Sequence, residues 1–319
     1  MPDNIDKNLW QEIISPGSFS GEVLFGETMK KHTSLKIGGP ADIFAFPQEV
    51  ISLKNMLTML KKKGIPSVPV GGGTNLLVRD GGIEGVVVSL RDCRRIEIID
   101  EAQDLISLFV ESGVPLQKLV SFTKENGFSG MEGLAGIPGS VGGAIAGNTG
   151  AYGYSMKSLI VSATIMHPDG RLDKLVAGEL GLEYRAAKLP AGSIILSANI
   201  KLRRDIKEDI ANRMEGFLRE KREKQPLSNL SAGCVFKNPV GCDSTLREGA
   251  SAGKLIDEAG CKGMRIGDVE VSFRHANFLI NKGNASASDF LKLMDAVRTK
   301  VSSVFGVELE PEIKIVGRG

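Results

Sequence analysis

The feature that most constrains this chain is a glycine-rich stretch over residues 130–153. Small aliphatic residues fill most of the space between its glycines, so the stretch gains little by burying its own side chains. Bare backbone of this kind can turn several N–H groups toward one ligand and can adopt positive φ angles. A row of amides suits an oxyanion, and above all a pyrophosphate. For one such loop alone, a set of tight turns is the commoner explanation. The glycines are Gly130, Gly133, Gly136, Gly139, Gly142, Gly143, Gly147, Gly150 and Gly153.

A second glycine loop changes that balance. A glycine triplet at 71–73 follows a short apolar run, and Thr74, Asn75 and a second apolar run come after it. Two anion-binding loops in one chain indicate a dinucleotide with two phosphates. The loop lacks the third glycine of G-x-G-x-x-G, and no G-x-x-x-x-G-K-[ST] motif occurs in the chain. The sequence therefore predicts a dinucleotide that is held by neither of these common loops.

Composition excludes several classes of partner. The 319 residues are enough for two or three domains, and 40 basic against 38 acidic residues give no argument for nucleic acid. The basic segment 219–224 also contains glutamates, which predicts a solvated helix face. No apolar segment approaches the length of a membrane span, and the N-terminal residues contain early acids instead of an apolar core. We expect a cytoplasmic protein that binds neither nucleic acid nor membrane.

Cysteine and histidine usage gives no metal signature. Cys93, Cys234, Cys242 and Cys261 show no C-x-x-C spacing, and the chain has only three histidines. We therefore expect free thiols, no structural zinc and no other metal.

Periodicity predicts mixed helices and strands. Residues 48–63 have an apolar stripe at helical spacing and end before Gly64, which with the flanking strands predicts a β-α-β unit. A hairpin is expected at 161–176 around the turn at 168–170. Further strands are expected at 32–42, 86–90, 95–99, 105–111, 193–202 and 307–316. Further helices are expected at 116–125, 206–224, 252–259 (capped by Ser251) and 288–304 (preceded by a capping box at Ser286).

The final strand alternates charged and apolar residues, which places the charges on one face. Pro311 favours an edge position. A solvated face is the preferred explanation for Glu308 and Glu310, whereas Glu312, deeper in the strand, is the one expected to face a cleft.

Three further side chains have both a plain and a chemical explanation. Cys234 lies in a glycine-flanked polar turn, where a thiol is either inert filler or a group that exchanges a proton. Arg185 is either a surface charge or a ligand for a carboxylate or phosphate. Lys224, at a helix exit, either pairs with the helix dipole or contacts an anion.

Six motifs together resemble the UDP-N-acetylenolpyruvoylglucosamine reductase family, flavoenzymes that complete UDP-N-acetylmuramate. The similarity runs in order from residue 32 to the C-terminus. The motifs are VGGGTNLLV (70–78), GLAGIPGSVGGAIAGNTGAYG (133–153), SAGCVFKNP (231–239), SAGKLIDEAGCKG (251–263), VSFRHANFLIN (271–281) and LEPEIKIVG (309–317).

The resemblance implies an α+β protein with the FAD-binding fold of the vanillyl-alcohol oxidase type. An FAD-binding domain over 1–204, with subdomains of about 1–80 and 81–204, would be followed by a smaller α+β substrate domain over 205–319. The link between Lys224 and Cys234 is short, so the chain is similar to the compact second subtype of the family. A monomer is expected.

The resemblance also assigns roles to individual residues. NADPH would reduce FAD and leave, and the enolpyruvyl ether of UDP-N-acetylglucosamine would then accept hydride at its terminal methylene carbon. Cys234 stands where the family has a serine, as the proton donor, and a thiol is the stronger acid. Arg185 and Glu312 match positions that stabilise the enolate, which requires Glu312 to be protonated or to share a proton. The loop Tyr184-Arg185-Ala186-Ala187 lacks a serine that is common after the family's Tyr-Arg pair.

Binding residues carry over in the same way. Those implied for FAD are Val70, Gly71, Gly72, Gly73, Thr74, Asn75, Leu76, Gly136, Ile137, Pro138, Gly139, Ser140, Gly143, Ala144 and Asn148. Those implied for substrate or NADPH are Lys224, Asn238, Tyr152, Lys237, His275 and Asn277.

Two other functions stay open at this point. A flavin oxidase or dehydrogenase of the same fold, acting on another small alcohol, explains the glycine loops but not the later motifs together. A nucleotide-sugar-binding module without catalysis keeps the glycine loops and would tolerate alanine at Cys234 and Glu312.

Overall fold

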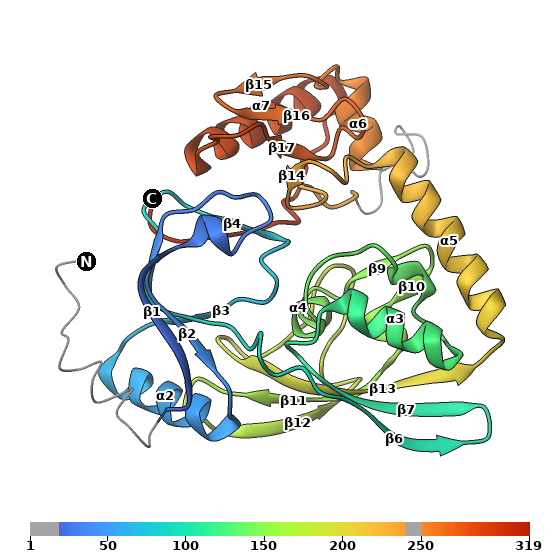
Figure 1. Cartoon of the computed structure of the whole chain (residues 1–319). Coiled ribbons are helices and arrows are strands. Elements are labelled where there is room, and N and C mark those ends of the chain that lie inside the picture. The colour runs from blue at the N-terminus through green and yellow to red at the C-terminus, as the bar shows by residue number, and fades with distance from the viewer. Residues whose placement is uncertain (1–18, 240–250) are drawn as a thin grey trace. The chain divides into compact units, whose positions relative to one another are not determined.

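The computed structural model describes residues 19–239 and 251–319 (Figure 1). Its contacts divide the chain into two compact units, which are described separately. The first unit comprises residues 19–27, Ala41–Gly72 and Glu84–Glu220. The second unit comprises Thr28–Pro40, Gly73–Ile83 and the described residues of Lys221–Gly319. Helices and β-sheets in both units confirm the α+β expectation.

The first unit opens with a four-stranded sheet in the order β1 (Gly21–Thr28), β2 (Pro40–Pro47), β5 (Ile83–Val88) and β3 (Ser67–Pro69). Helix α2 (Val50–Lys63) connects β2 to β3, and β3 runs parallel to β5. Gly64 ends the helix in the left-handed region at φ 68°. The buried face of α2, with Leu53, Met56 and Leu57, packs against this sheet. The predicted helix and the strand after it are therefore confirmed, whereas the strand before it begins at Pro40 and not at residue 32.

A second sheet in the first unit is antiparallel. Its order is β12 (Leu172–Val176), β11 (Ile160–Met166), β13 (Ile194–Arg204), β7 (Leu105–Glu111) and β6 (Ile96–Ala102), and β8 (Phe128–Ser129) pairs with the end of β13. The predicted hairpin is thus confirmed as β11–β12. Helices α3 (Leu116–Asn126) and α4 (Val141–Ala146) share one apolar core with this sheet (Figure 1).

Short elements surround the glycine-rich stretch of the first unit. They are the 3-10 helices Glu132–Leu134 and Met156–Ser158 and the paired strands β9 (Gly150–Ala151) and β10 (Tyr154–Ser155). Helix α5 (Lys207–Lys224) begins in the first unit and ends in the second.

The second unit contains a four-stranded sheet in the order β14 (Leu230–Ser231), β17 (Leu279–Asn281), β16 (Val269–Val271) and β15 (Arg265–Ile266). Helices α6 (Ala252–Glu258) and α7 (Ala287–Phe305) pack with it around one core. The Oγ atom of Ser251 accepts a hydrogen bond from Lys254 N at 3.2 Å, and that of Ser286 accepts one from Asp289 N at 3.0 Å. Both predicted N-caps are confirmed.

Two predicted strands are wrong. Residues 32–35 form turns and residues 36–39 have no regular structure, and the 3-10 helix Met29–Lys31 precedes them. Lys36 has a φ of 55°, which a continuous strand does not permit. At the C-terminus only β18 (Lys314–Val316) is a strand, paired in parallel with β4 (Leu76–Val78). Burial still alternates before it: Leu309 is buried while Glu308 and Glu310 are exposed. The alternation therefore predicted correctly that Leu309 is buried and that Glu308 and Glu310 are exposed. It predicted a paired strand that is longer than the one observed.

The two compact units are discontinuous in sequence, unlike the domains expected over 1–204 and 205–319. Residues 28–40 and 73–83 belong with the C-terminal part, because β4 pairs with β18 and because Leu35, Ile37 and Leu77 join the core of the second unit. The division by function, with an FAD-binding part and a substrate-binding part, stays a prediction.

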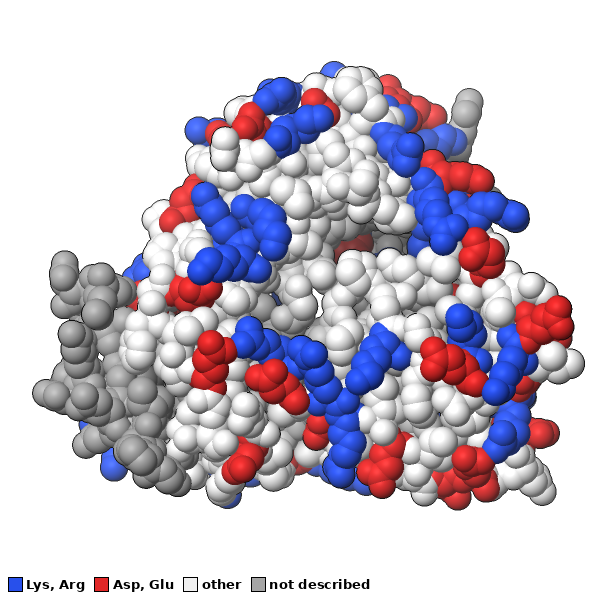
Figure 2. Space-filling model, viewed as in Figure 1, with Lys and Arg blue, Asp and Glu red and all other residues white. Residues whose placement is uncertain are grey.

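On the face that Figure 2 shows, side chains of both charges occur, and wide uncharged areas lie between them. Within residues 19–239 and 251–319, every helix is too short or too polar to cross a bilayer.

Candidate functional site

The two glycine loops lie against each other in the first unit. A Cβ atom on Gly71 would stand 2.5 Å from Ser140 Oγ, and one on Gly72 would stand 2.8 Å from Gly139 Cα. The atoms next to Gly72 belong to the backbone of Gly139 and Ser140, so a side chain at Gly72 is excluded and the loops meet backbone to backbone there. The pairing of these loops, which are far apart in sequence, is what a shared ligand would require.

Unused backbone donors gather where these loops meet. Within the described residues, the N–H groups of Gly71, Gly72, Gly139 and Ser140 make no hydrogen bond to the protein. The second loop is held by two other bonds: Leu116 N donates to Gly139 O at 2.9 Å, and Ser140 Oγ accepts from Gly143 N at 3.3 Å. These N–H groups lie beside glycines where an added Cβ atom would collide with the neighbouring loop. Such an arrangement of free N–H groups fits the diphosphate of FAD.

Replacing Gly72 with alanine is expected to raise the FAD dissociation constant at least about tenfold, because the new methyl group forces the loops apart. The measurement is flavin fluorescence during dilution of the purified protein. Gly178→Ala is the matched control, because a Cβ there meets no heavy atom within 4 Å. Equal affinity of both variants for FAD would contradict a shared binding site.

The other residues implied for FAD are mostly backbone or packing contributors. Val70, Leu76 and Ala144 are buried and apolar. Asn148 is 8% exposed and uses both ends of its amide within the chain: Nδ2 donates to Glu183 O at 2.6 Å, and Oδ1 accepts from Lys157 N at 2.9 Å. Asn148 therefore ties the loop that carries Arg185 to the glycine-rich stretch.

Arg185 is close to the end of the same stretch. Its Nη1 donates to Gly150 O at 3.0 Å, and its own φ is 55°. The ring of Tyr152 stacks on Phe217 of α5, with centroids 4.6 Å apart. The first unit thus places Arg185 and Tyr152 at the same strand pair, β9–β10, or beside it.

In the second unit, Cys234 and Glu312 lie on adjacent antiparallel segments. Glu312 N donates to Val235 O at 2.7 Å, and Phe236 bridges to Pro311. Asn75, from the first glycine loop, donates through Nδ2 to Glu312 O at 3.1 Å. The structure therefore brings together the segment that carries Cys234, the segment that carries Glu312 and the exit of a glycine loop, although the sequence separates them widely.

Asn277 holds the segment that follows Cys234. It is 2% exposed, its Oδ1 accepts from Phe236 N at 2.9 Å, and its Nδ2 donates to Phe236 O at 2.8 Å. Val235 N also donates to Asn277 O at 2.9 Å. Asn277 was expected to bind substrate, but both ends of its side-chain amide form hydrogen bonds to the backbone of Phe236. Its position assigns it to shaping the Cys234 loop.

Replacing Asn277 with leucine is expected to lower the free energy of unfolding by about 3 kcal/mol, because the buried N–H and C=O of Phe236 both lose their partner. Chemical denaturation measures this loss. Asn238→Leu is the control: this position is exposed, its Oδ1 accepts from a backbone N–H, and the change should cost about 1 kcal/mol. If Asn277→Leu lowers the free energy of unfolding no more than Asn238→Leu does, the Asn277 side chain does not hold the backbone of Phe236.

The remaining residues expected to bind substrate also contact the protein. Lys237 Nζ lies 3.3 Å from Glu310 Oε2, and Asn238 Oδ1 accepts from Ala252 N at 3.0 Å, at the start of α6. Burial, together with the charge of Lys262, lowers the pKa of His275, and its Nδ1 accepts from Asn277 N at 3.3 Å. His275 is therefore neutral near pH 7.

The basic segment at the end of α5 is not uniformly solvated, unlike the expected solvated face. Lys221 is only 3% exposed, and burial lowers its pKa to about 8, whereas Arg222 and Lys224 are exposed. The sequence could not reveal this, because a single lysine among charged neighbours carries no periodic signal.

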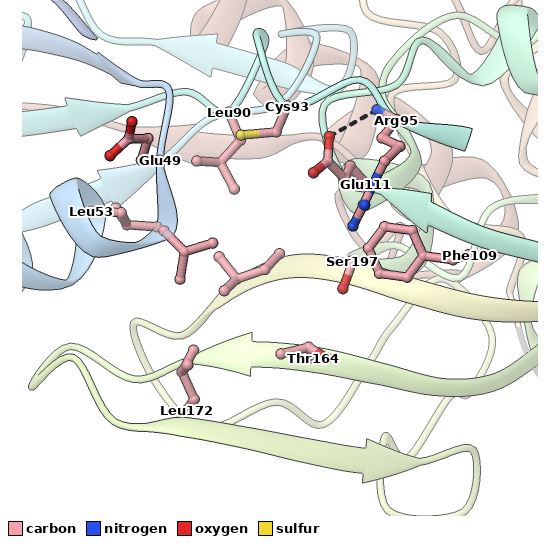
Figure 3. Close-up of a pocket in the computed structure, with 12 residues that line it drawn as sticks. Glu49, Leu53, Leu90, Cys93, Arg95, Phe109, Glu111, Thr164, Leu172 and Ser197 are labelled. Carbon is pink, nitrogen blue, oxygen red and sulfur yellow. Dashed lines mark hydrogen bonds between the residues drawn. The ribbon is translucent and has the colours of Figure 1, made fainter. Parts of the chain in front are cut away.

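A pocket of about 220 Å³ in the first unit is lined by none of the predicted site residues (Figure 3). Leucines 53 and 90 and Phe109 form apolar walls, and Arg95 N donates to Glu111 Oε2 at 2.8 Å on one side. Burial and the nearby carboxylates of Glu111 and Asp92 raise the pKa of Cys93, which keeps this thiol protonated.

Several polar residues that organise the site have no motif in the sequence. Glu132 is 1% exposed and accepts hydrogen bonds from Gly130 N and Arg213 Nη2, both at 2.7 Å. Burial raises its pKa, but these hydrogen bonds outweigh burial and leave the pKa below its ordinary value. Gln117 bonds to the backbone of the glycine-rich stretch. In the sequence, neither Glu132 nor Gln117 differs from an ordinary polar residue in or near a helix.

Two family descriptions match the chain. Residues 41–175 match an FAD-binding domain, and residues 225–316 match the C-terminal domain of UDP-N-acetylenolpyruvoylglucosamine reductase. The first match confirms the expected FAD-binding fold and FAD as the cofactor.

Relatives of known name agree with these matches. A UDP-N-acetylenolpyruvoylglucosamine reductase of Geotalea uraniireducens is 41% identical over 297 residues, covering 93% of this chain and 95% of its own length. One of Clostridium novyi is 42% identical, covering 98% and 97%. The crystal structure of the reductase from Thermus caldophilus superposes with a TM-score of 0.77 at 33% identity, covering 93% of this chain and 99% of that one. The identity and the full-length coverage together show that the chain belongs to the UDP-N-acetylenolpyruvoylglucosamine reductase family.

Proposed function

We propose that the protein reduces the enolpyruvyl ether of UDP-N-acetylglucosamine to UDP-N-acetylmuramate with NADPH, and so serves peptidoglycan precursor synthesis. Family membership supports the reaction. The observation that carries it is the antiparallel pairing of the Cys234 and Glu312 segments, with Glu312 N bonded to Val235 O at 2.7 Å. A module that only bound the nucleotide sugar would have no need of a thiol and a carboxyl group carried on paired segments.

When bound, FAD would supply the redox chemistry, which is the transfer of two electrons from NADPH to the substrate's methylene carbon. The residues proposed to hold its diphosphate are the amides of Gly71, Gly72, Gly139 and Ser140. Their role in this proposal is to bind and orient, with no proton to exchange.

The protein's own chemistry is the addition of one proton. When the methylene carbon gains hydride, the neighbouring carbon takes the negative charge and shares it with the substrate carboxylate. Cys234 Sγ gives its proton to that carbon, which completes the saturated lactyl ether and leaves a thiolate that solvent reprotonates. A protonated Glu312 and the guanidinium of Arg185 stabilise the developing charge.

Substrate binding is assigned to cations and to the Cys234 loop. Lys224 is exposed and pairs with a phosphate of the UDP group or of NADPH. Lys237 and Asn238 follow Cys234 by three and four residues and contribute from the same segment. We assign Asn277 and His275 to holding this loop in shape. A cytoplasmic monomer remains the expectation.

Spectroscopy and turnover together test the function. The purified protein should be yellow, and it should consume NADPH steadily only when the enolpyruvyl nucleotide is added. A flavin oxidase would instead consume oxygen with a small alcohol, and a binding module would bind the nucleotide without oxidising NADPH. Either of these results, or NADPH oxidation that ignores the nucleotide, would overturn the proposal.

A further inference from the structure

We infer that Gln117 of α3 is a positioning residue that shapes the second glycine loop for FAD. Three hydrogen bonds carry this inference. Gly136 N donates to Gln117 Oε1 at 2.7 Å, and Gln117 Nε2 donates to Ile137 O at 2.6 Å and to Leu134 O at 3.1 Å. One side chain thus satisfies three backbone groups of the loop. The inference rests on the proposed contact between FAD and Gly139–Ser140.

The bonded segment leads directly into the unused amides. Gly136 has a φ of 77°, so the chain reverses where Gln117 grips it, and Pro138 and Gly139 follow. The next residue of α3 toward its N-terminus, Leu116, donates its own N–H to Gly139 O at 2.9 Å. The first turn of α3 therefore holds the loop from Leu134 to Gly139 and sets the direction of the N–H groups of Gly139 and Ser140.

The chemistry of this contact requires an amide. A glutamine offers one acceptor and two donors in a single plane, which matches one N–H and two C=O groups. Glutamate would keep the bond from Gly136 N but would place a carboxylate against two carbonyl oxygens. Leucine would fill a similar volume and remove all three bonds. The two substitutions therefore separate the loss of donors from the loss of the whole contact.

Positioning predicts an effect on FAD affinity beyond the effect on stability. Backbone amides that already point toward the ligand bind FAD without losing conformational entropy on binding. If the loop becomes less ordered, this entropy cost raises the dissociation constant for FAD. Asn126, at the other end of α3, provides the matched control, because within the described part of the chain its Nδ2 donates only to Phe122 O of the same helix, at 2.8 Å. Asn126→Leu removes an amide hydrogen bond from α3 without touching the loop.

The experiment compares Gln117→Leu, Gln117→Glu and Asn126→Leu as holoenzymes. Dilution with flavin fluorescence gives the FAD dissociation constant, and thermal unfolding gives the midpoint. Both Gln117 variants should bind FAD at least about tenfold more weakly than the parent, while Asn126→Leu should lower the midpoint and keep the affinity within about twofold. If Gln117→Leu does not fold, Gln117→Glu decides alone, since it preserves shape and one bond.

An FAD dissociation constant within about twofold of the parent in the Gln117 variants would overturn the inference, as would equal weakening in Asn126→Leu. The proposed reductase activity fails on a different result, namely NADPH consumption that does not depend on the enolpyruvyl nucleotide. FAD binding can be measured whichever way that result falls, so the two failures are distinguishable.

Discussion

Replacing Cys234 with alanine is expected to slow reduction of the enolpyruvyl nucleotide by about 10²- to 10⁴-fold, the usual contribution of a positioned general acid. Methyl cannot give the proton that the substrate carbon needs, whereas flavin reduction by NADPH does not use that proton. Rapid-mixing absorbance separates the two halves of the reaction. Bleaching of the flavin by NADPH should keep its rate, and its recovery on adding the nucleotide should slow.

Two companion variants make this result specific. Cys234→Ser should retain a good part of the rate, because a hydroxyl can still donate a proton from the same place. Cys93→Ser, in the first unit and apart from the predicted site residues, should leave both halves of the reaction unchanged. If Cys234→Ala recovers its flavin colour as fast as the parent, the thiol is not the proton donor.

Replacing Glu312 with alanine is expected to cost about 10²- to 10³-fold in the same half-reaction, the size of effect seen when a group that stabilises developing charge is removed. The loop itself should survive, because the bonds that place residue 312 use its backbone N and O. Glu312→Gln keeps a hydrogen-bond donor but no acidic proton, so it should fall between alanine and the parent.

Glu310→Gln is the matched control for this prediction. Glu310 is two residues away, is exposed, and pairs only at the surface with Lys237. Its substitution should change the rate less than about twofold, since exposed ion pairs contribute little. Equal losses at Glu310 and Glu312 would show that the segment matters only for folding, and would remove Glu312 from the chemistry.

Local patterns predicted much of this protein. The spacing of the glycines located both loops, and helical periodicity located α2. A serine just before each expected helix located the N-caps at Ser251 and Ser286. Each of these signals spans a few residues and depends on backbone conformation or hydrogen bonds within that span. The sequence motifs likewise identified Cys234 and Glu312, although they could not show that the segments carrying these two residues adjoin.

Other features depended on segments that meet only after folding. The contact of Gly72 with Gly139, the clamp of Asn277 on Phe236 and the grip of Gln117 on Gly136 all join distant segments. The strand expected at 32–42 failed for a local reason instead: Leu35 and Ile37 are buried in the core of the second unit, but the positive φ of Lys36 between them keeps the segment from forming a ladder.

The sequence by itself thus determined which backbone is bare, where helices begin and end, and which side chains can carry a proton or a charge. Only the tertiary structure decided which of those groups lie next to each other. It also decided that the side-chain amides of Asn148 and Asn277 form hydrogen bonds within the protein and that Lys221 is buried. The physical reason is range. Conformational preference and capping act between near neighbours, whereas burial and hydrogen-bond satisfaction are settled by whichever distant segment packs alongside.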